Sequence, residues 1–155
     1  KTKVKLIKKD FKQTDYEFRD SIYYELSNSL VLLTEKFGMN TLSFAFGTDN
    51  KDKGKAWNVD YNFASLRYEN MYPLTKSTML TSGIELYKDR YKIKEDVLYN
   101  NKKRDDKVIL DLGVLQSINK NLSLGATLRY INNDSNQNIY EYDKYVVRTN
   151  IYYSF

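Results

Sequence analysis

Hydrophobic and polar positions alternate at the C-terminal end of the chain, from Tyr145 to Phe155 (YVVRTNIYYSF). In steps of two back from the terminus, every residue is apolar, aromatic or β-branched: Phe155, Tyr153, Ile151, Thr149, Val147 and Tyr145. The residues between them are mixed and include a charge: Ser154, Tyr152, Asn150, Arg148 and Val146. A period of two predicts a β-strand with one apolar and one polar face.

The same alternation recurs through the second half of the chain. One face of segment 121–132 is apolar or aromatic: Leu122, Leu124, Ala126, Leu128 and Tyr130. Its other face carries Ser123, Gly125, Thr127 and Arg129, and segments 107–117 and 78–94 follow the same pattern. Glycine, hydroxyl and charged side chains make a poor soluble core, so we expect the apolar face of each strand to point outward.

About eight strands are expected, and most exceed the length of roughly 5–6 residues that is usual in globular proteins. They suit tilted membrane crossings of about 9–11 residues. The first half is less regular, because segment 22–37 is also compatible with a hairpin turning at Ser27–Ser29 or with an amphipathic helix. The expected ranges are 2–12, 20–36, 40–48, 56–70, 78–94, 107–117, 121–132 and 143–155.

Short and long connections alternate between these strands. The short turns are 37–40, 71–77 and 118–121, and the long polar loops are 14–19, 49–55, 95–106 and 132–143. This asymmetry is typical of outer-membrane barrels, whose periplasmic turns are short and whose extracellular loops are long. With the C-terminus in the periplasm, the long loops lie outside the cell, and we expect them to carry selectivity.

Composition narrows the class of protein. The 155 residues include 15 Tyr and 7 Phe, and no apolar run approaches the roughly 18 residues of a transmembrane helix. We therefore predict one all-β domain over residues 1–155. It is an antiparallel up-and-down transmembrane β-barrel in the bacterial outer membrane, with about eight strands in this chain, or the last strands of a larger barrel. The chain begins at Lys1 without an apolar signal segment, so the export signal is expected upstream.

The terminal strand predicts the contacts of such a barrel with its surroundings. Tyr145, Ile151, Tyr153 and Phe155 are expected to form an aromatic girdle and the terminal assembly signal, which the barrel-assembly machinery reads. Tyr87, Tyr91 and Tyr130 are further girdle candidates. The other expected partners are the lipid bilayer and lipopolysaccharide.

Charged residues on the polar parity are expected to face the lumen. They are Asp60, Glu85, Asp111, Arg129 and Arg148, with Trp57, Val59, Tyr61 and Phe63 outward from Asp60. An interior of eight strands is just wide enough for side chains to fill, and buried charges of both signs are expected to pair.

The sequence offers little for catalysis or cofactors. It contains no Cys and no His, which removes thiol chemistry, Ser–His devices and the usual zinc sites. The acidic pairs Asp105–Asp106 and Glu95–Asp96 fall in expected loops, and the acidic residues lack the spacing of a calcium loop. The net charge of +5 is interleaved, whereas a nucleic-acid groove needs a stripe of one sign. We therefore predict no enzyme activity, no metal, no cofactor and no nucleic-acid partner.

Several local motifs occur in a recognisable order over the last two-thirds of the chain. A strand pair around a proline turn (68–86) precedes Arg104-Asp105-x-Lys107. Asn121-Leu122-Ser123-Leu124, Asn133-Asp134-Ser135-Asn136 and Tyr140-x-Tyr142-Asp143 follow. This order resembles the C-terminal barrel of bacterial porin-like proteins with tetratricopeptide repeats, including the surface lipoprotein assembly modifiers. The resemblance implies a barrel that follows a periplasmic helical-repeat domain, has more strands than are counted here, and helps to move cargo outward.

Three functions therefore stay open at this point. The first is a porin-like conduit, or an export or assembly barrel for periplasmic or surface protein cargo. The second is a small closed eight-stranded barrel that serves as a membrane anchor, adhesin or receptor. The third is a soluble β-barrel binding module, in which the apolar face of each strand would point inward.

Overall fold

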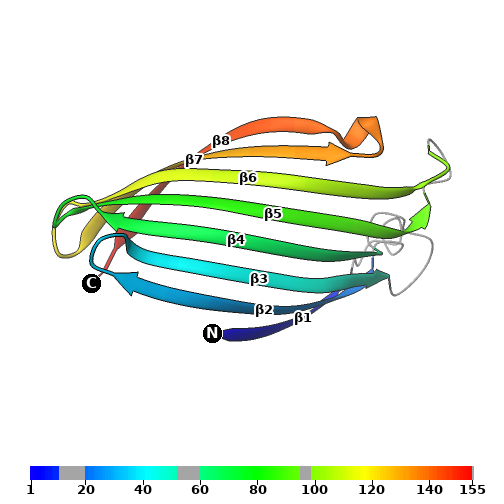
Figure 1. The fold of residues 1–155 in the computed structure, drawn as a ribbon, viewed down its shortest axis with the longest axis horizontal. Helices are drawn as coiled ribbons and strands as arrows, with labels where there is room; N and C mark the ends of the chain where they lie inside the picture. The colour runs from blue at the N-terminus through cyan, green and yellow to red at the C-terminus, as the bar shows by residue number, and fades with distance from the viewer. Residues whose placement is uncertain (11–19, 52–59, 95–98, 155) are drawn as a thin grey trace.

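The structure is a computed structural model that describes residues 1–10, 20–51, 60–94 and 99–154. Its described residues form one sheet of eight strands and a short 3₁₀ helix, η2 (Asn138–Tyr140). The strands are β1 (Thr2–Lys9), β2 (Ser21–Thr34), β3 (Gly38–Lys51), β4 (Tyr61–Pro73), β5 (Thr78–Lys94), β6 (Lys102–Ser117), β7 (Leu122–Ser135) and β8 (Tyr142–Tyr153). The prediction of an all-β, antiparallel up-and-down sheet of about eight strands is confirmed (Figure 1).

Each strand pairs with its sequence neighbours, so the order in space is the order in the chain. β1 and β8 are the two edges, and the sheet is not closed between them. The short connections 35–37, 74–77 and 118–121 lie at one end of the sheet, which we call the turn end (Figure 1). Residues 99–101 and η2 lie at the opposite end, which we call the loop end.

The strand expected at 20–36 is confirmed, whereas two expected loops are partly wrong. β2 is continuous and pairs with β3 from Ser21↔Lys51 to Thr34↔Gly38, which excludes a hairpin or a helix in segment 22–34. The segments expected to be long loops at 95–106 and 132–143 are partly strand, because β6 begins at Lys102 and β7 continues to Ser135. Polar residues remain in strands here because they pair in register, as in Asp105↔Ser135.

Other predicted features fall only partly within the described residues. Of the expected loop 49–55, residues 49–51 belong to β3, and the remainder lies outside the described residues. The expected loop at 14–19, residues 95–98, and Trp57, Val59 and Phe155 also lie outside them.

The sheet curves, and Arg67, Glu85 and Asp111 mark its concave face. Neighbouring strands are about 4.8 Å apart, so side chains two strands apart meet only where they converge. On this face Tyr23 of β2 stacks on Phe63 of β4, with ring centroids 5.3 Å apart. Residues paired in register share a face, which assigns every paired position to the concave or the convex side.

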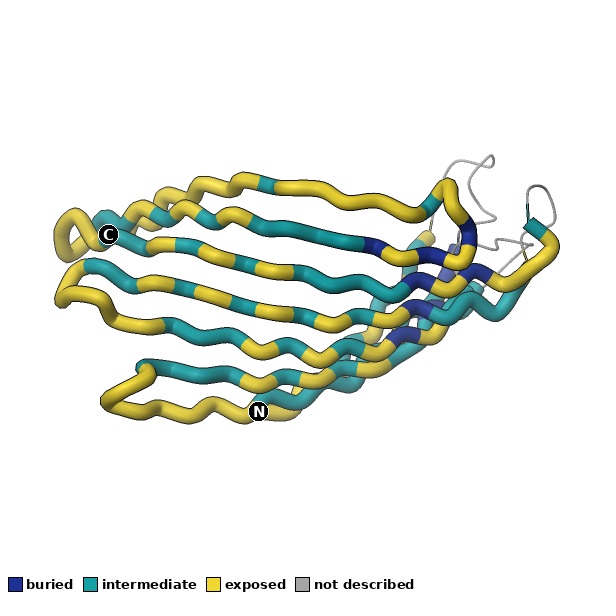
Figure 2. The backbone as a smooth tube through the Cα atoms, turned by 45° about the horizontal axis from the view of Figure 1, so that its top comes forward, coloured by how far each residue is buried: buried dark blue, intermediate teal, exposed yellow. Residues whose placement is uncertain are grey.

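Polarity on the two faces is the reverse of that in a soluble sheet. Phe63 is the only buried apolar residue among the described residues, whereas the buried polar ones include Asp49, Asp89 and Asp105. Exposed and partly buried residues alternate along the strands, and the buried ones gather at the loop end (Figure 2). Large apolar side chains on the convex face stay exposed, including Leu112 at 62%.

Gly47 allows the concave face to close around the Tyr23–Phe63 stack. A Cβ at this position would lie 2.0 Å from the backbone oxygen of Tyr24 and 2.7 Å from the Phe63 ring. Gly83 lies in β5 opposite Asp111. There the nearest atom to an added Cβ, the backbone oxygen of Tyr68, would be 3.4 Å away, which is an ordinary contact.

We predict that Gly47→Ala lowers the free energy of unfolding by about 1–3 kcal/mol, because backbone atoms cannot make room for the methyl group. Gly83→Ala is the matched control and is expected to change stability by less than about 1 kcal/mol. Urea unfolding in detergent micelles, followed by circular dichroism, measures both. Equal losses in the two variants would contradict the close approach at Gly47.

Candidate functional site

The concave face carries two layers of polar side chains, one toward each end of the sheet. The layer toward the turn end is an ion-pair network centred on Arg67 of β4. Arg67 Nη1 lies 2.8 Å from Glu85 Oε2, while its Nη2 lies 2.9 Å from Glu69 Oε1 and 3.1 Å from Asp111 Oδ2. One guanidinium therefore joins carboxylates from β4, β5 and β6.

Arg129 of β7 continues this network across the sheet. Its Nε lies 2.6 Å from Asp111 Oδ1, and its Nη2 donates to Asp111 Oδ2 at 2.8 Å, so the pair is bidentate. Such fork-shaped pairs hold both groups in one geometry. Asp111 thus lies between two guanidinium groups, Arg67 and Arg129, and fixes their positions.

A cavity of about 370 Å³ opens beside the network. Arg148 and Asn150 of β8 line it together with Asp111 and Arg129. Arg148 is exposed, and no hydrogen bond or ion pair joins its side chain to another residue in the described parts of the chain. The rest of the lining is mostly polar: Met39, Thr41, Arg67, Glu69, Asn70, Met71, Thr81, Ser82, Gly83 and Thr127.

The structure brings together most of the residues expected to face the lumen. Glu85, Asp111 and Arg129 belong to one network, and Arg148 borders the same cavity.

Asp60 lies elsewhere, and its predicted position is corrected. It comes just before β4 and pairs with Lys92 at 3.1 Å. Lys92 Nζ also donates to Thr48 Oγ1, and Thr48 is on the convex side, because it pairs in register with Asn62 rather than with Phe63.

The error at Asp60 comes from inverted polarity near the loop end of β4. There the aromatic residues Tyr61 and Phe63 are concave, and Asp60 and Asn62 have the convex parity. Large and polar residues alternate regularly in this part of β4, but near the loop end the large apolar residues lie on the concave face. Because of this inversion the odd-numbered residues of the strand were expected to point outward, and Arg67 and Glu69 were not predicted as lumen-facing residues. Both residues are odd-numbered, as are the concave residues of β4. In the structure, Arg67 pairs in register with Glu85.

The second layer, toward the loop end, is built from stacked aromatic rings. Phe63 lies between Tyr23 and Tyr87, with centroid distances of 5.3 and 5.7 Å and an interplanar angle of 8° in each case. Tyr61 and Tyr91 form a neighbouring pair at 5.1 Å. Tyr87 and Tyr91 are therefore concave residues, and their prediction as members of an outer girdle is wrong.

Lysine–carboxylate pairs surround these rings. Lys107 Nζ lies 2.7 Å from Asp89 Oδ2 and 5.1 Å from the centroid of Tyr87, so one ammonium group meets both a carboxylate and a ring face. Lys103 Nζ pairs with Asp105 at 3.2 Å and lies over the ring of Tyr91 at 4.2 Å. Lys9 pairs with Asp49 in the same way. Cation–π contacts and ion pairs stabilise each other in such a desolvated layer.

The residues predicted for the terminal strand lie on the convex face of β8. Tyr145, Ile151 and Tyr153 are exposed, and Tyr145 packs against Tyr130 of β7 at a centroid distance of 5.0 Å. Phe155 lies outside the described residues.

No helix in the described residues is both long and apolar enough to cross a membrane. Within residues 1–10, 20–51, 60–94 and 99–154, no three acidic side chains are placed to hold a metal ion. No protein-family model, curated protein or solved structure matches the chain.

We predict that Arg67→Met lowers the free energy of unfolding by about 1–3 kcal/mol. It leaves three carboxylates without their shared cation, but the Arg67 side chain is 24% exposed, so the loss is smaller than for a fully buried pair. Arg148→Met removes the same charge from the same face, and we expect a change within about 0.5 kcal/mol. Urea unfolding compares the two, and similar losses would contradict the central role of Arg67.

Proposed function

We propose that this chain is the wall of a bacterial outer-membrane β-barrel whose concave face lines a polar conduit. The observation that carries the proposal is the continuous apolar belt on the convex face. Every strand from β1 to β8 contributes exposed apolar or aromatic residues to it, including Leu6, Phe44, Leu66, Ile84, Leu112, Leu128 and Ile151. A surface of this kind is stable in hydrocarbon and unfavourable in water.

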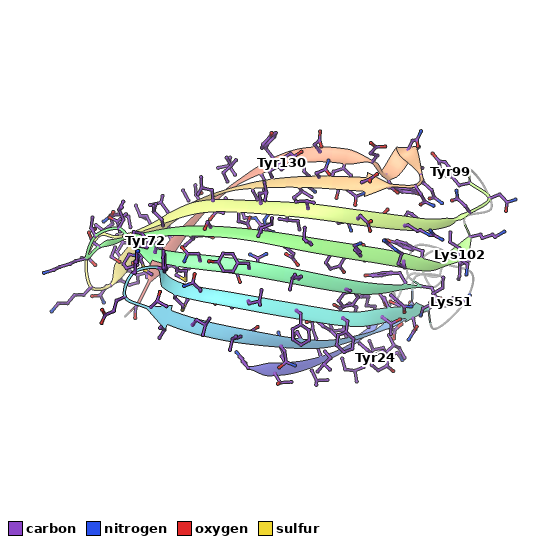
Figure 3. All side chains as sticks on the ribbon, viewed as in Figure 1. Tyr24, Lys51, Tyr72, Tyr99, Lys102 and Tyr130 are labelled. Carbon is purple, nitrogen blue, oxygen red and sulfur yellow. The ribbon has the colours of Figure 1, made fainter. Side chains whose placement is uncertain are left out.

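Tyrosines at both limits of the belt support a membrane position. Tyr72 lies close to the turn end, while Tyr24 lies toward the loop end (Figure 3). Both occupy convex positions, as do Tyr68, Tyr130, Tyr145 and Tyr153. Tyrosine rings favour the headgroup region, where the hydroxyl reaches water and the ring stays in an apolar setting.

Beyond the belt, convex positions at the loop end become polar. Arg90 and Asp106 form an ion pair there at 2.5 Å, and Lys88 lies 4.0 Å from the same carboxylate. In the proposal the strands therefore extend beyond the hydrocarbon at the loop end. In the proposal the loop end faces the cell exterior, near lipopolysaccharide, and the turn end faces the periplasm. The assembly machinery would then bind β8.

The soluble binding module is the less favourable reading. A soluble sheet needs an apolar core, but the described residues bury only Phe63 of this kind. Its concave side would contribute ion pairs and hydroxyl groups to the interior, which stabilise little compared with apolar burial.

The two concave layers support two functions within the membrane. The cavity and its polar lining favour passage of solute or cargo along the concave face. The packed layer of rings and lysines at the loop end instead favours a second candidate, a plugged barrel that acts as an anchor or receptor. The family resemblance implies a role in moving surface cargo, and this role requires the first function, passage along the concave face.

The membrane proposal predicts that the free-energy cost of an arginine on the convex side of β6 depends strongly on its depth in the bilayer. Leu112→Arg is expected to lower the free energy of folding into lipid vesicles by about 2–4 kcal/mol, because the charge enters hydrocarbon. Gln116→Arg lies on the same strand and face, nearer the turn end, and is expected to cost about 0–1 kcal/mol. In a soluble protein the exposed Leu112 would tolerate arginine, so equal stabilities would overturn the proposal.

Planar-bilayer conductance separates the conduit from the anchor. We predict that the inserted protein, with both edges of the sheet paired, conducts ions and that Arg148→Glu shifts its selectivity toward cations, because the cavity loses a positive charge and gains a negative one. Lys8→Glu makes the same charge change on the convex face and should leave selectivity nearly unchanged. Insertion without any current would favour the plugged anchor.

A further inference from the structure

Both edges of the sheet have the pattern of membrane-facing strands, yet neither has an outer neighbour. Val4 of β1 is 77% exposed and Val147 of β8 is 73% exposed, and both lie on the convex face. An edge strand in hydrocarbon leaves backbone N–H and C=O groups without hydrogen bonds, which a membrane does not tolerate. Under the proposed function, each edge must therefore pair with another strand.

Direct pairing of β1 with β8 meets an electrostatic obstacle. The concave positions of β1 include Lys3, Lys5 and Lys9, and those of β8 include Lys144 and Arg148. Neither strand has an Asp or Glu at a concave position. Closing the sheet by this pair would place two basic rows side by side, and like charges on facing strands are destabilising.

The interior of the sheet follows the opposite rule. Lys5 is in register with Glu25, Arg67 with Glu85, and Asp111 with Arg129, so basic and acidic side chains meet across neighbouring strands. Where two concave acids face each other, at Asp89↔Asp105, each forms an ion pair with a lysine of β6, Lys107 or Lys103. Lys3 and Arg148 depart from this rule, because their register partners are the uncharged Ser27 and Thr127. A second copy of the chain cannot supply the missing acids, because its free edges are the same two basic strands.

We propose that β8 and β1 are joined through a β-hairpin whose convex residues are apolar and whose concave residues are Asp or Glu. This inference rests on the proposed function. β1 and β8 run in opposite directions, so an antiparallel barrel accepts only an even number of inserted strands, of which two is the smallest. The hairpin completes the backbone hydrogen bonds at both edges and neutralises Lys3, Lys144 and Arg148.

Two synthetic hairpins test the charge rule. They share one turn and identical apolar convex residues, and carry either Glu or Lys at every concave position. With the full chain in detergent micelles, fluorescence anisotropy is expected to show at least about tenfold tighter binding of the Glu hairpin at low salt. The difference should shrink in 1 M salt, where charges are screened within about 3 Å.

A charge-reversed chain is the matched control. In the variant Lys3→Glu, Lys144→Glu and Arg148→Glu, the preference should invert toward the Lys hairpin. None of these side chains forms an ion pair among the described residues, so the variant is expected to fold. Equal binding of both hairpins, binding of neither, or an unchanged preference in the variant would overturn the inference.

A disulfide test addresses direct pairing of β1 with β8. The chain has no native cysteine, so only the introduced cysteines can form a disulfide. Val4→Cys is combined in turn with Val147→Cys, Thr149→Cys or Ile151→Cys, and oxidised in micelles. We expect no disulfide within a monomer, and one in any pair would overturn the inference, as would a stable homodimer joined at these edges. The micelle assays need no bilayer, so a negative result in them contradicts only the inference about the hairpin. A negative result in the Leu112→Arg test contradicts the proposed function itself.

Discussion

Curvature of the antiparallel sheet is the constraint on which the other features of this protein depend. It brings together side chains that lie two strands apart, so that Tyr23 reaches Phe63 and Arg67 reaches Asp111. Between Tyr23 and Phe63 this convergence requires a residue without a side chain on β3, and Gly47 occupies that position. The concave face becomes crowded and polar, while the convex face is left open and apolar.

This distribution reverses the usual relation between polarity and burial. Charged groups withdrawn from water are tolerated only when they are paired, and the concave face meets that condition with Arg67, Asp111 and Arg129 near the turn end. Near the loop end, lysines such as Lys107 satisfy both a carboxylate and a ring. The apolar belt has no such internal partner, and in the proposed function a bilayer covers it.

The two ends of the concave face differ in how tightly they are filled. A cavity bordered by Arg148 remains at the turn end, whereas stacked rings occupy the loop end. This difference is the reason why the proposed function includes both a conduit and a plugged barrel. The concave positions of both edge strands carry basic side chains and no acidic ones.

The sequence by itself determined the strands and much of their facing. In β6 to β8 the period of two separates Leu112 from Asp111 and Leu128 from Arg129, because alternation is a local property of an extended chain. Alternation does not say which side is concave, nor at what height the apolar side changes from convex to concave. The concave positions of Tyr61 and Tyr87 could therefore be assigned only from the tertiary structure. The same holds for the pairing of Arg67 with Asp111, because these contacts depend on curvature and register between strands distant in sequence.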